Sequence, residues 1–340
     1  MALTTTDHRR TLSVAARIVA SIAGLTLVLG TLAGCRDGSG PASSPSTTTR
    51  STAPLVVVTT PILGDLVRQV GGDAITVDVL IPPGADPHDF EPSAAQAARL
   101  RDATLVIANG LGLEENLEST LKGARDDGVT VVEIGDRLNP ITIDDHDHDA
   151  ERTSKSDHNH GGDDPHFWLD PERMATAATL VATQLAALPG VDNATVQARA
   201  VSYSDSAKAA LAEATQLLSV VPAADRKLVT NHDALEYFAQ RFNLDVIGTA
   251  IPGGSTMAEP SAADIKNLVD VIKRNGVRAI FSESTVSSKI IETVQREVGS
   301  QVRVVELSTD TLGPAGSETA TYPGLIVTTA RLIANGLTGK

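Results

Sequence analysis

Short apolar runs alternate with amphipathic stretches along most of the chain from Leu55 onward. Four runs in the first half are β-branched and bounded by turn residues, which predicts strands at 55–60, 75–82, 103–109 and 129–134. Between them, helical spacing with Gly or Pro punctuation predicts helices at 61–72, 93–102 and 113–123. Strands that alternate with helices in this way predict a parallel sheet covered by helices on both faces.

The second half of the chain repeats the arrangement. Strand-like runs occur at 227–232, 244–250, 277–284 and 302–308. Helical patterns occur at 233–242, 261–276, 286–299 and 323–337. Ser261 followed by Asp264 predicts a helix start, because a short acceptor and an early acid both suit that end of a helix.

A region of different character joins the two halves. Asp170-Pro171 opens a predicted helix that runs to Ala187, and an Ala-rich helical pattern then continues from Asn193 to Val220. At 1.5 Å per residue the second helix is on the order of 40 Å long, enough to span two lobes. The predicted fold class is α/β. A lobe at 55–190 and a lobe at 222–340 each hold a four-stranded parallel sheet flanked by helices, and one long backbone helix at 191–221 joins them.

The first residues have the pattern of a secretory signal. Arg9 and Arg10 precede an apolar run from 18 to 32, and Leu-Ala-Gly stands before Cys35, the one cysteine in the chain. This string resembles the lipobox of bacterial lipoproteins, so we expect residues 1–34 to be removed and Cys35 to be acylated. A Ser/Thr/Pro-rich tether follows to residue 54. The expected location is the outer face of the cytoplasmic membrane; an ordinary signal with a free thiol is the alternative.

The formal net charge is −14, which argues against nucleic acid as a partner, since phosphate binding needs a basic face. An acidic surface suits a cationic partner and also suits simple solubility.

Histidines provide the candidate chemistry. His88 and His232 each follow a predicted strand, and His166 comes after the last strand of the first lobe. In α/β sheets ligands gather at the carboxyl ends of strands, so we expect these three side chains to converge in the cleft between the lobes. Imidazole and carboxylate are common zinc ligands. A fourth ligand from the second lobe is either Asp310 or Glu283, each near the end of a predicted strand.

Six motifs, taken together, resemble the metal-binding lipoproteins of zinc and manganese ABC importers. They are PGADPHDFEPS, NGLGLEENL, DPHFWLDP, NHDALEYFAQRFNL, FSES and TDTLG, in the order found in that family. The resemblance implies that His88, His166, His232 and Asp310 bind the metal ion. It also implies a monomer that works with a membrane permease and its cytosolic ATPase. One departure from the family is Asp310-Thr311-Leu312, where Asp-Pro-Leu is common. Another is a final helix that keeps Tyr322 and lacks the usual Met-Met pair.

The donor set favours Zn²⁺ as the transported ion. Manganese-binding members generally have a carboxylate where His232 stands, and manganese prefers oxygen donors, whereas three imidazoles with one carboxylate suit zinc. Copper(II) and nickel(II) bind the same donors, and a manganese or other divalent-metal receptor is the alternative.

The stretch 142–165 is rich in Asp, Gly and Ser and holds four further histidines: His146, His148, His158 and His160. His-rich tracts bind metal weakly, so we expect an accessory site here. A solvated acidic loop without a binding role is the alternative.

Two other classes of protein compete with a receptor. A metallohydrolase needs an open coordination position and a general base, but the chain has no His-Glu-x-x-His pair, and four converging ligands close the site. A surface adhesin with the same fold is the second rival, since fold does not fix function. The sequence therefore predicts a receptor that binds zinc and catalyses no reaction.

Overall fold

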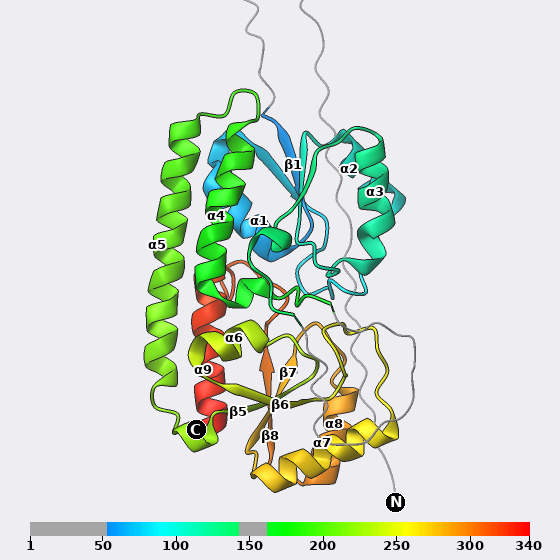
Figure 1. Cartoon of the computed structure of the whole chain (residues 1–340), viewed down its shortest axis with the longest axis vertical. Coiled ribbons are helices and arrows are strands. Elements are labelled where there is room, and N and C mark those ends of the chain that lie inside the picture. The colour runs from blue at the N-terminus through cyan, green and yellow to red at the C-terminus, as the bar shows by residue number, and fades with distance from the viewer. Residues whose placement is uncertain (1–52, 143–161) are drawn as a thin grey trace, which may run out of the picture. The chain divides into compact units, whose positions relative to one another are not determined.

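The computed structural model describes residues 53–142 and 162–340, and the elements in these ranges follow the predicted order (Figure 1). In chain order they are β1 (Leu55–Val58), α1 (Pro61–Gly71), β2 (Thr76–Val79), α2 (Ala94–Asp102), β3 (Leu105–Ala108), α3 (Glu118–Asp126), β4 (Val131–Glu133), α4 (Pro171–Ala186), α5 (Asn193–Leu218), β5 (Lys227–Thr230), α6 (Glu236–Phe242), β6 (Asp245–Thr249), α7 (Ala262–Asn275), β7 (Ala279–Glu283), α8 (Lys289–Val298), β8 (Arg303–Leu307) and α9 (Tyr322–Thr338). Cys35, the tether up to residue 52 and the histidines at 146, 148, 158 and 160 lie outside the described residues.

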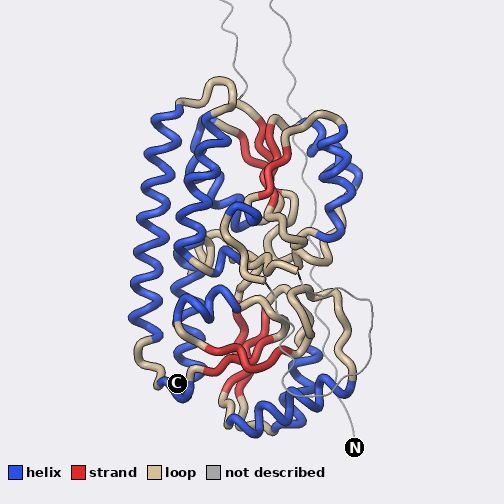
Figure 2. Tube along the Cα trace, in the orientation of Figure 1, coloured by secondary structure: helices blue, strands red, loops and turns tan. Residues whose placement is uncertain are grey.

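Two four-stranded parallel sheets organise the described chain, as the sequence predicts (Figure 2). The strand order is β2-β1-β3-β4 in the N-terminal lobe and β6-β5-β7-β8 in the C-terminal lobe, so the two lobes share one topology. In each sheet the order of strand addition reverses between the two central strands, β1 and β3 or β5 and β7. In parallel sheets, ligands bind beyond the carboxyl ends of the strands at such a reversal.

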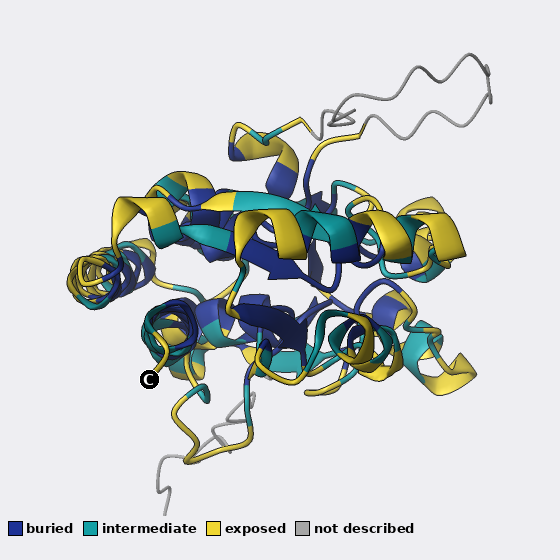
Figure 3. Ribbon diagram, turned by 90° about the horizontal axis from the view of Figure 1, so that it is seen from below, coloured by how far each residue is buried: buried dark blue, intermediate teal, exposed yellow. Residues whose placement is uncertain are grey.

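Helices cover both faces of each sheet. In β1 the side chains of Val56 and Val58 pack into the large core shared with α1 and α4, and Val57 points to the opposite face against α2 and α3. The C-terminal sheet follows the same rule, with Val229 and Ile280 packed against α7 and α8. The central strands of both sheets are largely buried, the edge strands are half-buried, and the outer faces of the helices are exposed (Figure 3).

The helix α5 links the two lobes. Its 26 residues extend about 39 Å, and it packs against α1 and α4 of the N-terminal lobe and α9 of the C-terminal lobe (Figure 1). The buried residues of α5 recur every three or four positions and are mostly small: Val196, Ala200, Tyr203, Ala207, Ala210, Ala214 and Leu218. Alanine lets neighbouring helices approach closely, and the large core cluster continues through this contact from one lobe to the other.

In the part of the chain that is described, no helix is long and apolar enough to cross a membrane.

Three predicted helices begin later than expected: those predicted from 233 and 286 begin at Glu236 and Lys289, and the third begins at Glu118. The pattern predicts a helix at 113–123, but the α-helical part is α3, and a short 3₁₀ turn precedes it at Glu115–Leu117. The cause is Glu114, whose buried carboxylate accepts the backbone N–H groups of Asn109 and Gly110 at 2.8 and 3.1 Å. This side chain holds the loop after β3 and does not open the helix.

Candidate metal centre

His88 lies in the loop that follows β2, and its own loop fixes its backbone. The backbone N–H of His88 donates to Oδ1 of Asp86 at 2.9 Å, across the intervening Pro87. The imidazole is buried, with 1% of the residue exposed.

His166 is held by the same tripeptide, Asp-Pro-His. Its N–H donates to Oδ1 of Asp164 at 2.9 Å, and the same oxygen lies 2.7 Å from Nδ1 of the ring. As predicted, His166 comes after β4, the last strand of its lobe; a long connection separates the two, and His166 directly precedes a 3₁₀ turn at Phe167–Leu169. Because Nδ1 faces Asp164, Nε2 points away from it into the space between the lobes.

His232 follows β5, one of the two central strands between which the strand order of the C-terminal sheet reverses. Its Nδ1 lies 2.5 Å from Oε2 of Glu283, which ends the neighbouring strand β7. Both residues are buried. The carboxylate therefore takes the outer ring nitrogen and leaves Nε2 facing the N-terminal lobe.

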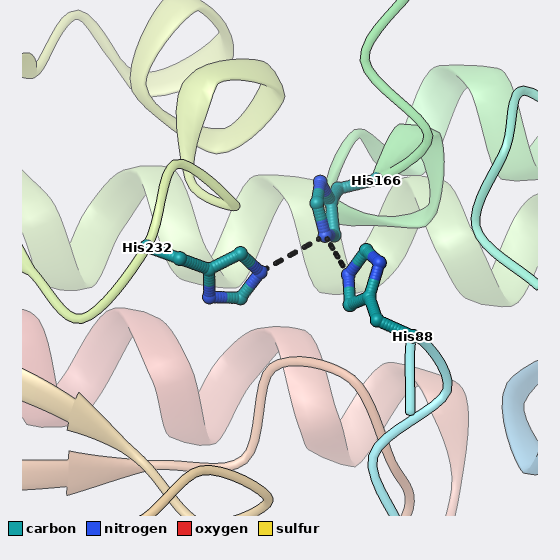
Figure 4. Close-up of side chains that lie close together, drawn as sticks. All are labelled: His88, His166 and His232. Carbon is teal, nitrogen blue, oxygen red and sulfur yellow. Dashed lines mark hydrogen bonds between the residues drawn. The ribbon is translucent and has the colours of Figure 1, made fainter. Parts of the chain in front are cut away.

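The three rings converge on one point (Figure 4). Nε2 of His166 lies 3.3 Å from Nε2 of His88 and 3.2 Å from Nε2 of His232. All three residues are buried, and they come from segments far apart in the sequence. The structure thus brings together the three histidines that the sequence singles out.

Asp310 lies beside this cluster in the loop after β8. Its Oδ2 is 4.0 Å from Nε2 of His232, the inner nitrogen. Asp310 is 2% exposed, and the described groups that stabilise its carboxylate are His232 and the side chain of Thr309. A buried carboxylate with so few partners is costly unless a cation accompanies it. Asp310 and Glu283 thus face opposite nitrogens of the same ring.

The histidines of the two lobes differ in charge. Burial lowers the pKa of His88 and His166 well below 6.5, and repulsion from the neighbouring histidines lowers it further. Burial also acts to lower the pKa of His232, but the carboxylates of Glu283 and Asp310 outweigh it and raise the pKa to about 9. Burial raises the pKa of Asp310 and of Asp164 to about 7.

Sequence reasoning missed the residues that orient the rings. Asp86 and Asp164 hold two of the histidines, and the signal for both is the repeated Asp-Pro-His tripeptide. Trp168 was also missed as a link between the lobes: its Nε1 donates to the carbonyl oxygen of Thr309 at 2.7 Å, next to Asp310. A link of this kind has no local sequence signal.

Comparison with known proteins identifies the family. The ZnuA family model, described as zinc-uptake complex component A periplasmic, matches residues 56–336, which include the whole cluster and both sheets. The chain belongs to this family.

Its relatives bind different metals. The zinc-binding protein TroA of Treponema pallidum is 31% identical over 281 residues, covering 80% of this chain and 85% of TroA. The iron-binding protein YfeA of Yersinia pestis is 27% identical, covering 83% and 85% of the two chains. The manganese-binding lipoprotein MntA of Halalkalibacterium halodurans is 26% identical, covering 83% and 88%.

A solved structure of TroA shares the fold. It superposes with a TM-score of 0.73 at 28% identity, and the match covers 84% of this chain and 99% of TroA. As a member of the ZnuA family, the chain is an extracytoplasmic metal-binding receptor that serves an ABC importer with its permease and ATPase. It is a binding protein and not an enzyme.

Proposed function

We propose that the protein captures Zn²⁺ between its lobes with His88, His166, His232 and Asp310 and delivers the ion to the importer's permease. The observation that carries the proposal is the convergence of three buried Nε2 atoms on one point beside the buried carboxylate of Asp310.

The spacing of the nitrogens supports a zinc site. Zn–N bonds of about 2.0–2.1 Å in a tetrahedron place neighbouring ligand atoms roughly 3.3 Å apart. The two Nε2–Nε2 distances are 3.3 and 3.2 Å. Zinc-binding histidines usually pair their second ring nitrogen with a carboxylate, a backbone carbonyl or water, and His166 and His232 pair theirs with Asp164 and Glu283.

The same pairing distinguishes the two candidate acids. Glu283 contacts Nδ1 of His232, so it suits the role of the group that orients the ring. Asp310 faces Nε2, the nitrogen that points into the cluster. We therefore take Asp310 as the fourth ligand.

The choice of zinc rests on donor chemistry. Relatives bind zinc, manganese or iron, so family membership leaves the metal open. Three imidazoles and one carboxylate suit zinc better than manganese, which prefers oxygen donors. A manganese receptor is the competing function.

We also propose that the protein is a monomer anchored by an acylated Cys35, and that the histidines at 146, 148, 158 and 160 form a weaker accessory site. These residues lie outside the described ranges. Cys35→Ser should release the protein from the membrane into the surrounding fluid, measured by fractionation of cells. Continued retention in the membrane fraction would refute the anchor.

Elemental analysis of the protein, purified without a histidine tag and loaded by dialysis against equal zinc, manganese, iron and copper, tests the function. We expect one tightly held zinc per chain. Stoichiometric manganese with little zinc would support the competing receptor, and no retained metal would reject both.

A further inference from the structure

The residue after Asp310 departs from the family pattern, and it contacts the opposite lobe. Oγ1 of Thr311 accepts the backbone N–H of Gly84 at 2.9 Å. Gly84 belongs to the loop that carries His88, and Thr311 is buried. Proline, which is common at this position in the resembling family, has no hydroxyl and makes no such bond. Thr311 thus links the loop of the first histidine to the loop of Asp310.

A second threonine of the C-terminal lobe contacts the same loop. Oγ1 of Thr256 donates to Oδ2 of Asp86 at 2.6 Å. The other oxygen of Asp86 accepts the backbone N–H of His88 at 2.9 Å. One carboxylate therefore connects the C-terminal lobe to the backbone of His88.

The segment of His166 is joined to the C-terminal lobe by different and stronger contacts. Asp170, four residues further on, accepts two hydrogen bonds from the guanidinium of Arg241 in α6, each 2.8 Å long. Bidentate pairs of this kind are among the stronger polar contacts in proteins. His166 and His232 are thereby held on the side of α4 and α6, whereas the His88 loop is held by hydroxyl groups.

We propose that Thr256 and Thr311 form a latch, here called the threonine latch, that holds the His88 loop against the C-terminal lobe and sets the rate of metal release. The inference rests on the proposed function, because His88 controls release only if it binds the ion. Opening the latch frees the loop after β2 and lets His88 leave the cluster, while the Arg241–Asp170 pair keeps His166 and His232 in place. Both threonines act as positioning residues through this loop.

Zinc release tests the latch. The full-length protein is loaded with zinc and mixed with excess EDTA, and the release rate is followed by Trp168 fluorescence or with a chromogenic zinc indicator. Thr311→Val should speed release about fivefold, the loss expected for one hydrogen bond between neutral groups. Thr256→Val should speed it about thirtyfold, because hydrogen bonds to a carboxylate are stronger. The double variant should release zinc faster than either single variant.

Three controls make the result specific. Thr311→Ser and Thr256→Ser keep the hydroxyl and should release zinc at the wild-type rate. Thr183→Val removes a hydroxyl that donates within α4 at 2.9 Å and should also leave the rate unchanged. Thermal unfolding of each metal-free variant is recorded beside the release rate.

The outcomes separate the latch from the proposed function. Wild-type protein that retains no zinc overturns the proposed function. Wild-type protein that retains zinc, with a double valine variant that releases it at the wild-type rate, overturns the latch alone. A lower unfolding temperature with an unchanged release rate, or equal acceleration by Thr183→Val, also overturns the latch.

Discussion

The two halves of the metal centre use the same side chain in opposite electrostatic settings. The N-terminal lobe supplies His88 and His166, whose pKa values burial lowers well below 6.5. The C-terminal lobe supplies His232, which lies between two carboxylates and has a pKa raised to about 9. At neutral pH the two imidazoles of the first half are neutral, and the imidazole of the second half holds a proton between carboxylates.

The difference teaches how a buried site accepts a cation. A buried positive ion needs compensating negative charge, and the carboxylates that supply it come from β7 and the loop after β8. Before the ion arrives, the proton on His232 supplies part of the positive charge. Metal binding therefore exchanges a proton for an ion in the C-terminal half, while the N-terminal half contributes imidazoles that are already neutral.

Removing a donor should have the largest effect. His232→Ala removes one imidazole ligand and should weaken zinc binding by more than about 100-fold. Loss of a residue that only hydrogen-bonds to a ligand typically costs about 10–100-fold. Calorimetric titration measures the change, with His148→Ala in the His-rich stretch as the matched control. Tight binding that survives His232→Ala would show that the C-terminal half is not part of the site.

The pH dependence of affinity should be the next largest effect. His232 must lose its proton to bind zinc, and its pKa is about 9. Because one proton is released for each ion bound, zinc affinity should rise about tenfold per pH unit from pH 7 to 9. Below pH 7 the dependence should steepen, because Asp310 has a pKa of about 7 and is also protonated there. The rise should stop above pH 9. Affinity that is flat from pH 7 to 9 would mean that His232 is already neutral at pH 7.

The carboxylates that contact the Nδ1 atoms, Glu283 on His232 and Asp164 on His166, should affect zinc binding differently in the two lobes. Glu283→Gln should weaken zinc binding about 10–100-fold at pH 9. The loss should be smaller at pH 7, because the same change lowers the pKa of His232 and relieves proton competition. Asp164→Asn removes the corresponding partner of His166 and should weaken binding without flattening the pH profile. Identical pH profiles for the two variants would contradict the assigned difference between the halves.

The smallest effect on the tight site should come from deleting residues 144–162. The ends of this stretch lie close together, since Thr142 and Asp163 form an isolated antiparallel bridge, so the deletion should leave the buried cluster intact. One tightly bound zinc ion should remain, and the additional, weakly bound ions should disappear with the loop histidines. Binding by the loop is expected to be weak because ordering a loop costs about 1–2 kcal/mol per residue. Loss of the tight equivalent would mean that the two groups of histidines were assigned in reverse.

Periodicity was enough to predict the order of strands and helices, because alternating β-branched runs and capped helices report local preferences. Ser261 with Asp264, for example, forms the expected capping box at the start of α7. The motifs also selected the residues that the fold brings together. Local patterns failed at Glu114, which resembles the start of a helix but accepts backbone N–H groups of the loop directly after β3.

The electrostatics of the site were beyond the sequence. By residue type His88, His166 and His232 share one unperturbed pKa of about 6.5. Their opposite shifts arise from burial and from Glu283, which lies 51 positions from His232 in the chain but 2.5 Å from its ring in the fold. Likewise, nothing near Thr311 in the sequence predicts its bond to Gly84.

A crystal structure of the zinc-loaded protein, with anomalous diffraction collected at the zinc edge, tests most directly the claim that both lobes hold one ion. We predict a single strong peak about 2.0–2.2 Å from the Nε2 atoms of His88, His166 and His232 and from a carboxylate oxygen of Asp310. Glu283 should remain on Nδ1 of His232. A peak bound by Glu283 in place of Asp310, or one held by residues of a single lobe, would contradict the account.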